Sequence, residues 1–196
     1  MEKIITIKSS NIYQFKITLK VIKPKIWRRI QVLGNYTFLD LHLAIQDAMG
    51  WGDCHLHQFE IMNPKTGERA LIATPHDEDF YEIISEGKAK ISQYFLSAKN
   101  KANYEYDFGD GWEHEVVLEK ILQSVVGNKY PQCIGGERAC PPEDCGGVWG
   151  YANLLKIIAN PTHPEYQELM EWLGDSFNPE EFDPKLVEFD NPRKPL

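Results

Sequence analysis

The stretch ANYEYDFGDGWEHEVVLEKIL, residues 102–122, decides the fold, because it reads as two strands joined by a tight turn. Aromatic and apolar residues alternate with polar ones along both halves, which predicts half-buried strands over 102–108 and 112–122. The residues of the predicted buried faces are Tyr104, Tyr106, Phe108, Trp112, His114, Val116 and Leu118.

Two different turns can join these strands. A two-residue turn at 110–111 has the stronger local signal, Asp-Gly, and would set Asp107 opposite His114. A three-residue turn at 109–111 pairs Tyr106 with His114 and keeps the apolar faces together. Because the buried face sets the register of a hairpin, we favour the three-residue turn.

The three-residue turn places carboxylates opposite one another on the polar face. Asp107 would face Glu113, and Glu105 would face Glu115. Like charges directly across a ladder are destabilising. We therefore expect either a bound cation or basic side chains from the N-terminal strands to lie near them.

Around this hairpin the pattern predicts an α+β fold, a single domain over 1–196 with a mostly antiparallel sheet and helices packed against it. A helix should follow Thr37, which precedes Asp40 in a capping box, and end at Gly50. Further strands are expected at 12–22, 26–32, 55–61 and 70–73, and further helices at 91–96, 148–159 and 164–173. Residues 74–88 and 127–147 are expected to be loops.

The composition is that of a well-packed soluble domain, with 42% hydrophobic and 12% aromatic residues among 196. No apolar run approaches the ~20 residues of a membrane span, and the N-terminus lacks the apolar core of a signal peptide. We therefore expect a cytoplasmic protein with no membrane partner, whose four cysteines are reduced.

The net charge of −8 is unevenly spread, because residues 1–31 carry eight Lys or Arg against one Glu. Such a basic segment on an acidic body is typical of a protein that binds nucleic acid. An equally good explanation is that the two halves attract each other in the fold. The candidate binding residues are Lys16, Lys20, Trp27, Arg28, Arg29 and Trp112.

Carboxylates and a histidine gather around the turn and in the later CPPEDCGG segment, residues 140–147. Such groups suit acid–base work or a divalent metal ion. The alternative is structural, since Asp and Gly are what a tight turn needs and acids near 148 would favour a helix start. The candidate catalytic residues are Asp107, Asp110, His114, Glu143 and Asp144.

Three cysteines lie close together and could bind zinc with one histidine. Their spacing is not that of a common zinc motif, so small buried thiols are the competing interpretation. The candidate ligands are Cys133, Cys140, Cys145 and His114, with Cys54, His55 or His57 as alternative fourth ligands. His55 and His57 would share one face of a strand, where a structural role is the more common one.

Together these motifs resemble the plasmid ORF-3-like family of the root-inducing plasmid, whose members are often labelled passenger proteins of insertion elements. The resemblance covers about 11–183 and rests on these segments: PKIWRR (24–29), LDLH (39–42), HLHQF (55–59), YDFGDGWEH (106–114) and CPPEDCGG (140–147). It implies one α+β domain found in bacteria and archaea, and little about activity.

Three functions remain open at this point. The first is an accessory protein that binds nucleic acid or protein through its basic strands. The second is a metal-dependent hydrolase using Asp107, Asp110 and His114, with zinc or another divalent ion as cofactor. The third is a purely structural or protein-interaction role.

Overall fold

One eight-stranded sheet organises the computed structural model, which describes residues 10–76, 82–174 and 177–190. The strand order is β5-β4-β3-β6-β7-β1-β2-β8, and every neighbouring pair is antiparallel except β4 with β5. The strands are β1 (Asn11–Leu19), β2 (Trp27–Leu33), β3 (His57–Met62), β4 (Arg69–Ala73), β5 (Ile83–Ser85), β6 (Lys101–Tyr106), β7 (Trp112–Gln123) and β8 (Gln132–Glu137). A single domain with a mostly antiparallel sheet is thus confirmed.

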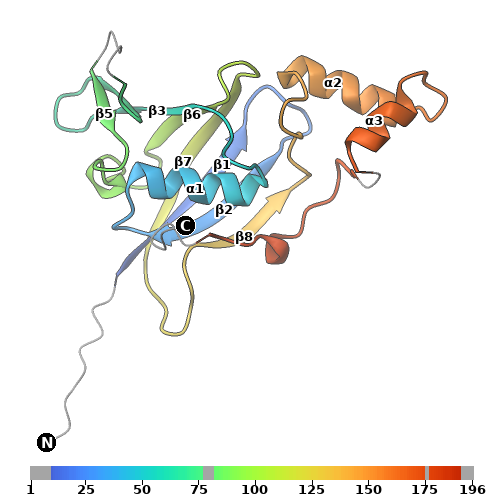
Figure 1. Ribbon diagram of the computed structural model, residues 1–196. Helices are drawn as coiled ribbons and strands as arrows, with labels where there is room; N and C mark the ends of the chain where they lie inside the picture. The colour runs from blue at the N-terminus through green and yellow to red at the C-terminus, as the bar shows by residue number, and fades with distance from the viewer. Residues whose placement is uncertain (1–9, 77–81, 175–176, 191–196) are drawn as a thin grey trace, which may run out of the picture.

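Helix α1 (Phe38–Met49) crosses one face of this sheet, whereas α2 (Gly147–Ile158) and α3 (Tyr166–Trp172) lie together at one end (Figure 1). Short 3₁₀ turns occupy Ile91–Gln93 and Pro184–Leu186. Within the described ranges, no helix is long and apolar enough to cross a membrane.

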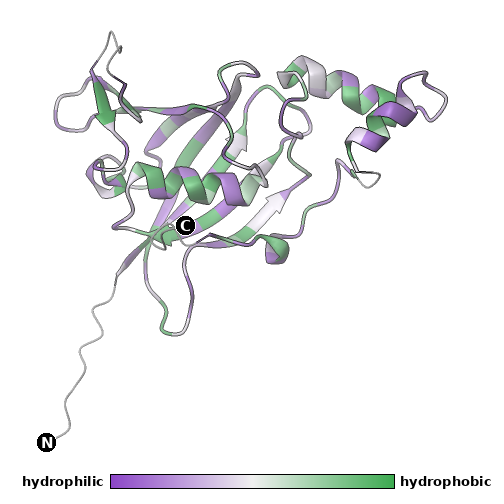
Figure 2. Cartoon of the chain, in the orientation of Figure 1, coloured by the Kyte–Doolittle hydropathy of each residue, from purple (hydrophilic) through white to green (hydrophobic). Residues whose placement is uncertain are grey.

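Helix α1 begins and ends as its sequence predicts. The Asp40 amide donates to the Thr37 hydroxyl at 3.2 Å, and the Thr37 amide donates to the Asp40 carboxylate at 2.8 Å. Gly50 closes the helix with a left-handed backbone at φ 84°. Apolar residues recur along α1, which lies over one face of the sheet (Figure 2). The Phe38 ring of this helix packs edge-on against Phe59 of β3, with ring centroids 5.1 Å apart.

The hairpin strands have the predicted buried faces, except that Phe108 lies in the loop and is half exposed, and the loop is longer than either predicted turn. Tyr106 pairs with Trp112 and Tyr104 with His114, so residues 107–111 form a five-residue connection. The predicted pairing of Tyr106 with His114 is therefore wrong by two residues, a shift that keeps every side chain on its own face.

The side chain of Asp107 explains the longer loop. Its Oδ1 accepts from the amides of Gly109 and Asp110 at 2.9 and 3.3 Å, which closes a turn that starts earlier than expected. Its own amide donates to the Leu56 carbonyl at 2.9 Å. The expected clash between Asp107 and Glu113 is thereby removed, and Glu113 faces Glu105 instead.

Two strands lie where loops were expected. β8 falls inside 127–147 and pairs with β2, and β5 falls inside 74–88 and pairs with β4. β8 contains Gly135 and Gly136, which hide its alternation, and β5 is only three residues long. Part of the expected 74–88 loop, 77–81, lies outside the described residues.

Candidate functional site

A pocket of about 390 Å³ opens at the start of β3, where residues of α1, β5, the β4 end and the hairpin loop surround it. Histidines and carboxylates make up much of its lining, and none of its described lining residues is Lys or Arg. The titratable groups in the lining are His42, Asp53, His55, His57, His76 and Glu86. Negative side chains without a fixed cation favour a positively charged occupant.

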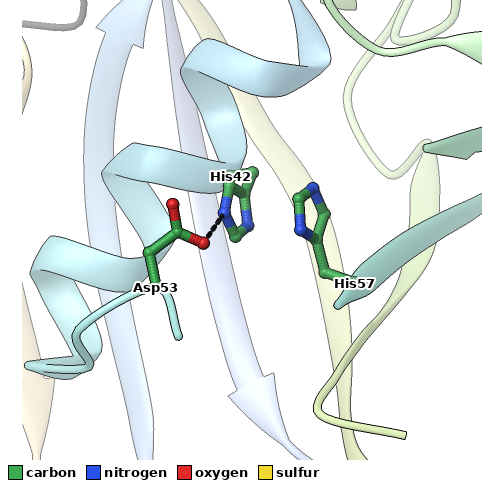
Figure 3. A group of neighbouring side chains, drawn as sticks. All are labelled: His42, Asp53 and His57. Carbon is green, nitrogen blue, oxygen red and sulfur yellow. Dashed lines mark hydrogen bonds and ion pairs between the residues drawn. The ribbon is translucent and has the colours of Figure 1, made fainter. Parts of the chain in front are cut away.

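Two imidazoles lie face to face in this pocket. The rings of His42 on α1 and His57 on β3 are parallel within 4°, with their centroids 3.4 Å apart (Figure 3). Each ring is held at its edge by a carboxylate. Two stacked rings this close disfavour a positive charge on both at once.

Glu86 holds His57. The Glu86 carboxylate lies 2.6 Å from His57 Nε2 and accepts a second hydrogen bond, also 2.6 Å, from the Thr74 hydroxyl. Burial pushes the pKa of Glu86 upward, but these hydrogen bonds and the nearby histidines together hold it below its ordinary value. An ionised Glu86 can only accept, so Nε2 of His57 carries the proton and Nδ1 is its basic nitrogen.

His42 belongs to a longer chain of hydrogen bonds. Its Nε2 lies 2.7 Å from Asp53, and its Nδ1 lies 2.8 Å from the Tyr104 hydroxyl, which in turn accepts from the Gln46 amide at 2.9 Å. Burial lowers the pKa of His42, and the hydrogen bond from His42 holds the pKa of Asp53 low against its own burial. His42 is therefore neutral, with Nε2 donating to Asp53 and Nδ1 accepting from Tyr104.

This network decides what His42 can do. The ligand atoms of His42, Asp53 and His57 lie within 4.8 Å of one another, close enough to surround a metal ion. Both nitrogens of His42 already make hydrogen bonds, however. A metal ion on Nε2 would move the ring proton to Nδ1, and the buried Tyr104 hydroxyl would then lose its acceptor. The arrangement is better described as two histidine–carboxylate dyads than as a metal site.

A second group lies next to the dyads and includes two of the predicted catalytic carboxylates. His55 Nε2 is 3.2 Å from an oxygen of Asp144 and 3.8 Å from an oxygen of Asp107. All three ligand atoms lie within 4.8 Å of one another. Although it sits between two carboxylates, this buried nitrogen makes no hydrogen bond.

The fold aims both carboxylates at His55. Asp107 is anchored through Oδ1 by the loop amides, which leaves Oδ2 facing the imidazole. Asp144 follows Glu143, whose carboxylate accepts from the Tyr106 hydroxyl at 2.5 Å and from the Gly52 amide at 2.9 Å. The hairpin, the segment before β3 and the loop before α2 therefore meet at one point.

Asp110 strengthens the same junction. Its carboxylate accepts from the Gly146 amide at 3.2 Å. The predicted carboxylates Asp107, Asp110, Glu143 and Asp144 are thus brought into one region, but only Asp107 and Asp144 face His55. Asp110 and Glu143 hold the loops in place.

The predicted histidine, His114, lies elsewhere. It is fully buried beneath the Trp51 ring, and its Nδ1 is 3.3 Å from the Tyr104 carbonyl. Burial lowers the pKa of His114 to about 4, so the ring is neutral. Trp112 is also buried, which leaves it unable to stack on a ligand.

The cysteines and His114 do not form the predicted zinc site. In the part of the chain that the structure describes, no three potential ligands that include a cysteine lie within 4.8 Å of one another. Cys140 packs its sulfur 3.7 Å from that of Met49, and burial raises the pKa of Cys140 and of Cys145 to about 12. Cys133 lies on β8 with its thiol near the Gly135 carbonyl. These thiols are small, half-buried groups.

The basic residues of β1 and β2 have partners within the fold. Arg29 makes two hydrogen bonds to Glu119, at 2.7 and 2.9 Å, and Lys20 pairs with Glu113 at 3.1 Å. The Lys16 ammonium lies 4.5 Å from the centre of the Trp27 ring. Arg29 and Lys20 thus pair with glutamates of β7, and a nucleic-acid partner stays a prediction.

Arg28 is buried against carbonyl groups rather than phosphate or carboxylate. Its guanidinium donates to the carbonyls of Ala48, Trp27 and Glu137 and lies 3.6 Å from the centre of the Phe182 ring. Its role is to join α1, β2 and β8 beneath the surface.

His42, Asp53 and Glu86 were not singled out as site residues from the sequence. His42 is buried on α1 among apolar residues, where an imidazole could have been noticed. Asp53 and Glu86 lie in segments that connect secondary-structure elements, and only the folded sheet determines where these segments run.

Comparison with known proteins places the chain in a group defined by sequence and fold. Residues 11–186 match the sequence family described as "Plasmid pRiA4b ORF-3-like protein". A relative is the "Uncharacterized protein y4hQ" of Sinorhizobium fredii (strain NBRC 101917 / NGR234), 32% identical over 169 residues, which are 85% of this chain and 83% of that protein. The crystal structure of the "Protein of Unknown Function MM3350" from Methanosarcina mazei Go1 is similar with a TM-score of 0.86 and 52% identity, over 92% of this chain and 99% of that one.

Proposed function

The chain belongs to the plasmid pRiA4b ORF-3-like family, and within that family we propose that it acts as a metal-dependent hydrolase. Its divalent ion is held by His55, Asp107 and Asp144. The observation that carries this proposal is the buried Nε2 of His55, which has no hydrogen bond although two carboxylate oxygens lie 3.2 and 3.8 Å away.

The 3.2 Å between His55 Nε2 and Asp144 matches the spacing of two ligands on one ion, and the 3.8 Å to Asp107 is slightly longer. Nitrogen and oxygen ligands lie about 2.1 Å from zinc, so two ligands on one ion are roughly 3.0–3.5 Å apart. One imidazole and two carboxylates form a donor set that suits zinc or manganese. Three protein ligands leave at least one coordination position for water, as in catalytic sites.

An ion there would lower the pKa of a bound water toward neutrality and supply the hydroxide for hydrolysis. His57 lines the same pocket two residues further along the chain. Because Glu86 fixes the proton on Nε2, Nδ1 of His57 is the nitrogen that can take a proton from the water.

Metal content tests the proposal directly. We expect about one zinc or manganese ion per chain by elemental analysis after dialysis against either metal. Asp107→Asn and Asp144→Asn should each lose the ion, because asparagine keeps the left-handed backbone of these positions but not the charge. Glu113→Gln, which alters an exposed carboxylate of β7, is the control and should keep it.

Hydrolysis gives the second readout. Cleavage of p-nitrophenyl acetate should stop with a chelator and return with zinc or manganese, and His57→Gln should slow it while leaving metal content unchanged. A protein that retains no ion above background, or that binds it equally in both aspartate variants, would overturn the proposal.

A further inference from the structure

We infer that the pocket accepts a cationic small molecule with a short apolar part, an amine-bearing compound, and that Asp53 is the carboxylate that meets its ammonium group. The inference depends on the proposed function only in treating the bound molecule as the substrate. It is carried by the charges and the shape of the pocket.

The charge of the pocket has one sign. Asp53 and Glu86 both line it, and no Lys or Arg is among its described lining residues. Each carboxylate has an imidazole as its hydrogen-bond partner, His42 for Asp53 and His57 for Glu86, and neither is paired with a Lys or Arg of the lining. A divalent ion bound by Asp107 and Asp144 would leave both of these pairs in place.

Of these two carboxylates, Asp53 is the accessible one. Glu86 is 3% exposed, and its two oxygens are hydrogen-bonded to His57 and Thr74. It therefore acts on a ligand only through its electrostatic field. The Asp53 side chain is 43% exposed, and its one hydrogen-bonded oxygen, Oδ1, is the partner of His42. The second oxygen of Asp53 is the group that can accept from an ammonium ion.

The pocket is small, and part of its wall is apolar. Its wall includes Leu39, Leu56, Ala73, Ile83 and Phe108. Phe108 and Leu56 are half exposed at the hairpin loop and before β3, so they form an apolar edge open to a ligand. About 390 Å³ holds one ring or a short alkyl chain but not a polymer.

In the metal-free pocket this combination disfavours anions. A phosphate ester or a carboxylate would enter a pocket that already holds two negative groups and offers no guanidinium or ammonium to bind it. The substrate class is therefore an amide or ester that also carries a free ammonium group, rather than a phosphodiester.

Three probes of equal size separate the alternatives: benzylamine, benzyl alcohol and benzoate. We would titrate each into full-length, chelator-treated protein at low salt and follow the NMR signals of the pocket histidines. We expect benzylamine to bind at least about tenfold more tightly than benzoate, with benzyl alcohol between them. Removing the metal first keeps benzoate from binding an ion directly.

Asp53→Asn is the decisive variant. Asparagine tolerates the φ of 53° at this position and can still accept from His42, so the fold and the dyad are kept while the charge is lost. The preference for benzylamine should fall severalfold in this variant and stay unchanged in Glu168→Gln, an exposed position on α3.

The inference is wrong if benzoate binds as well as benzylamine, if none of the probes binds, or if Asp53→Asn leaves the preference intact. These outcomes are independent of the metal analysis. A chain that holds no ion but prefers benzylamine would remove the proposed function and keep the pocket assignment.

Discussion

Tyr106 donates its hydroxyl hydrogen bond to Glu143 across 2.5 Å, and this bond ties the hairpin to the loop that carries Asp144. Burial and the Glu143 charge raise the pKa of Tyr106, so the phenol keeps its proton. The same oxygen accepts from the Cys54 amide at 3.0 Å, next to His55. One hydroxyl thus joins the three segments that supply the proposed metal ligands.

Tyr106→Phe should therefore weaken metal binding more than it weakens the fold. We expect about 1–2 kcal/mol of lost unfolding free energy, because the Cys54 amide and Glu143 both lose a partner. Metal affinity, measured by calorimetry, should drop about tenfold or more as Asp144 loses its support. Tyr13→Phe removes a hydroxyl from β1 and should leave metal affinity unchanged.

Gly147→Ala should separate the hairpin loop from α2. Gly147 has a φ of 65°, and an added Cβ would lie 2.4 Å from the Asp110 carbonyl oxygen. We expect a loss of more than about 2 kcal/mol in chemical denaturation, from strain together with the clash. Gly174→Ala has a similar φ of 74° with nothing within 4 Å, so it should show the backbone strain alone, about 1 kcal/mol.

Acid should destabilise the protein through His114. Burial holds the pKa of His114 at about 4 in the fold, below its ordinary value of 6.5. As pH falls below 6.5, His114 takes up a proton in the unfolded chain but stays neutral in the folded chain. About 3 kcal/mol of stability is therefore lost between pH 6.5 and 4. Urea denaturation of His114→Gln should show a flatter pH dependence across this range, and an unchanged slope would contradict the assignment.

Asp47→Asn should stabilise the protein near neutral pH. Burial, with the nearby charges of Asp190 and Asp53, raises the pKa of Asp47 to about 6. The folded chain thus holds a proton between about pH 4 and 6 that the unfolded chain releases, so stability falls as pH rises through this range. The melting temperature of Asp47→Asn should exceed that of the wild type at pH 7, and the difference should shrink toward pH 4.

A double-mutant cycle should rank the ion pairs of the basic strands. Arg29 and Glu119 are less than a third exposed and form two hydrogen bonds, so Arg29→Gln with Glu119→Gln should give a coupling energy of about 1 kcal/mol. The more exposed Lys20–Glu113 pair should give about 0.3 kcal/mol. Equal couplings would mean that burial does not strengthen the Arg29 pair.

Local sequence patterns predicted much of the fold. Thr37, Asp40 and Gly50 mark the ends of α1, because capping depends on neighbouring residues alone. The alternation of β1 and of the hairpin likewise identifies their buried faces. β8 was not predicted, because its two glycines break the alternation and its pairing with β2 is a long-range contact.

The candidate site was predicted in part, for a related reason. Asp107 and Asp144 were expected to meet, and they do so around His55 rather than His114. His114 lies on the buried face that the alternation predicts, opposite Tyr104. The sequence could not show that Asp107 would face His55, because the Asp107 side chain fixes the loop length through its own hydrogen bonds.

The strand order has a consequence for how the protein is made on the ribosome. β1 is synthesised first, yet it lies between β2 and β7, so its second edge stays open until about a hundred further residues have emerged. His42, Asp53 and His57 leave the exit tunnel long before Asp144. The nascent chain therefore presents its histidines early and completes their surroundings only near the end of translation.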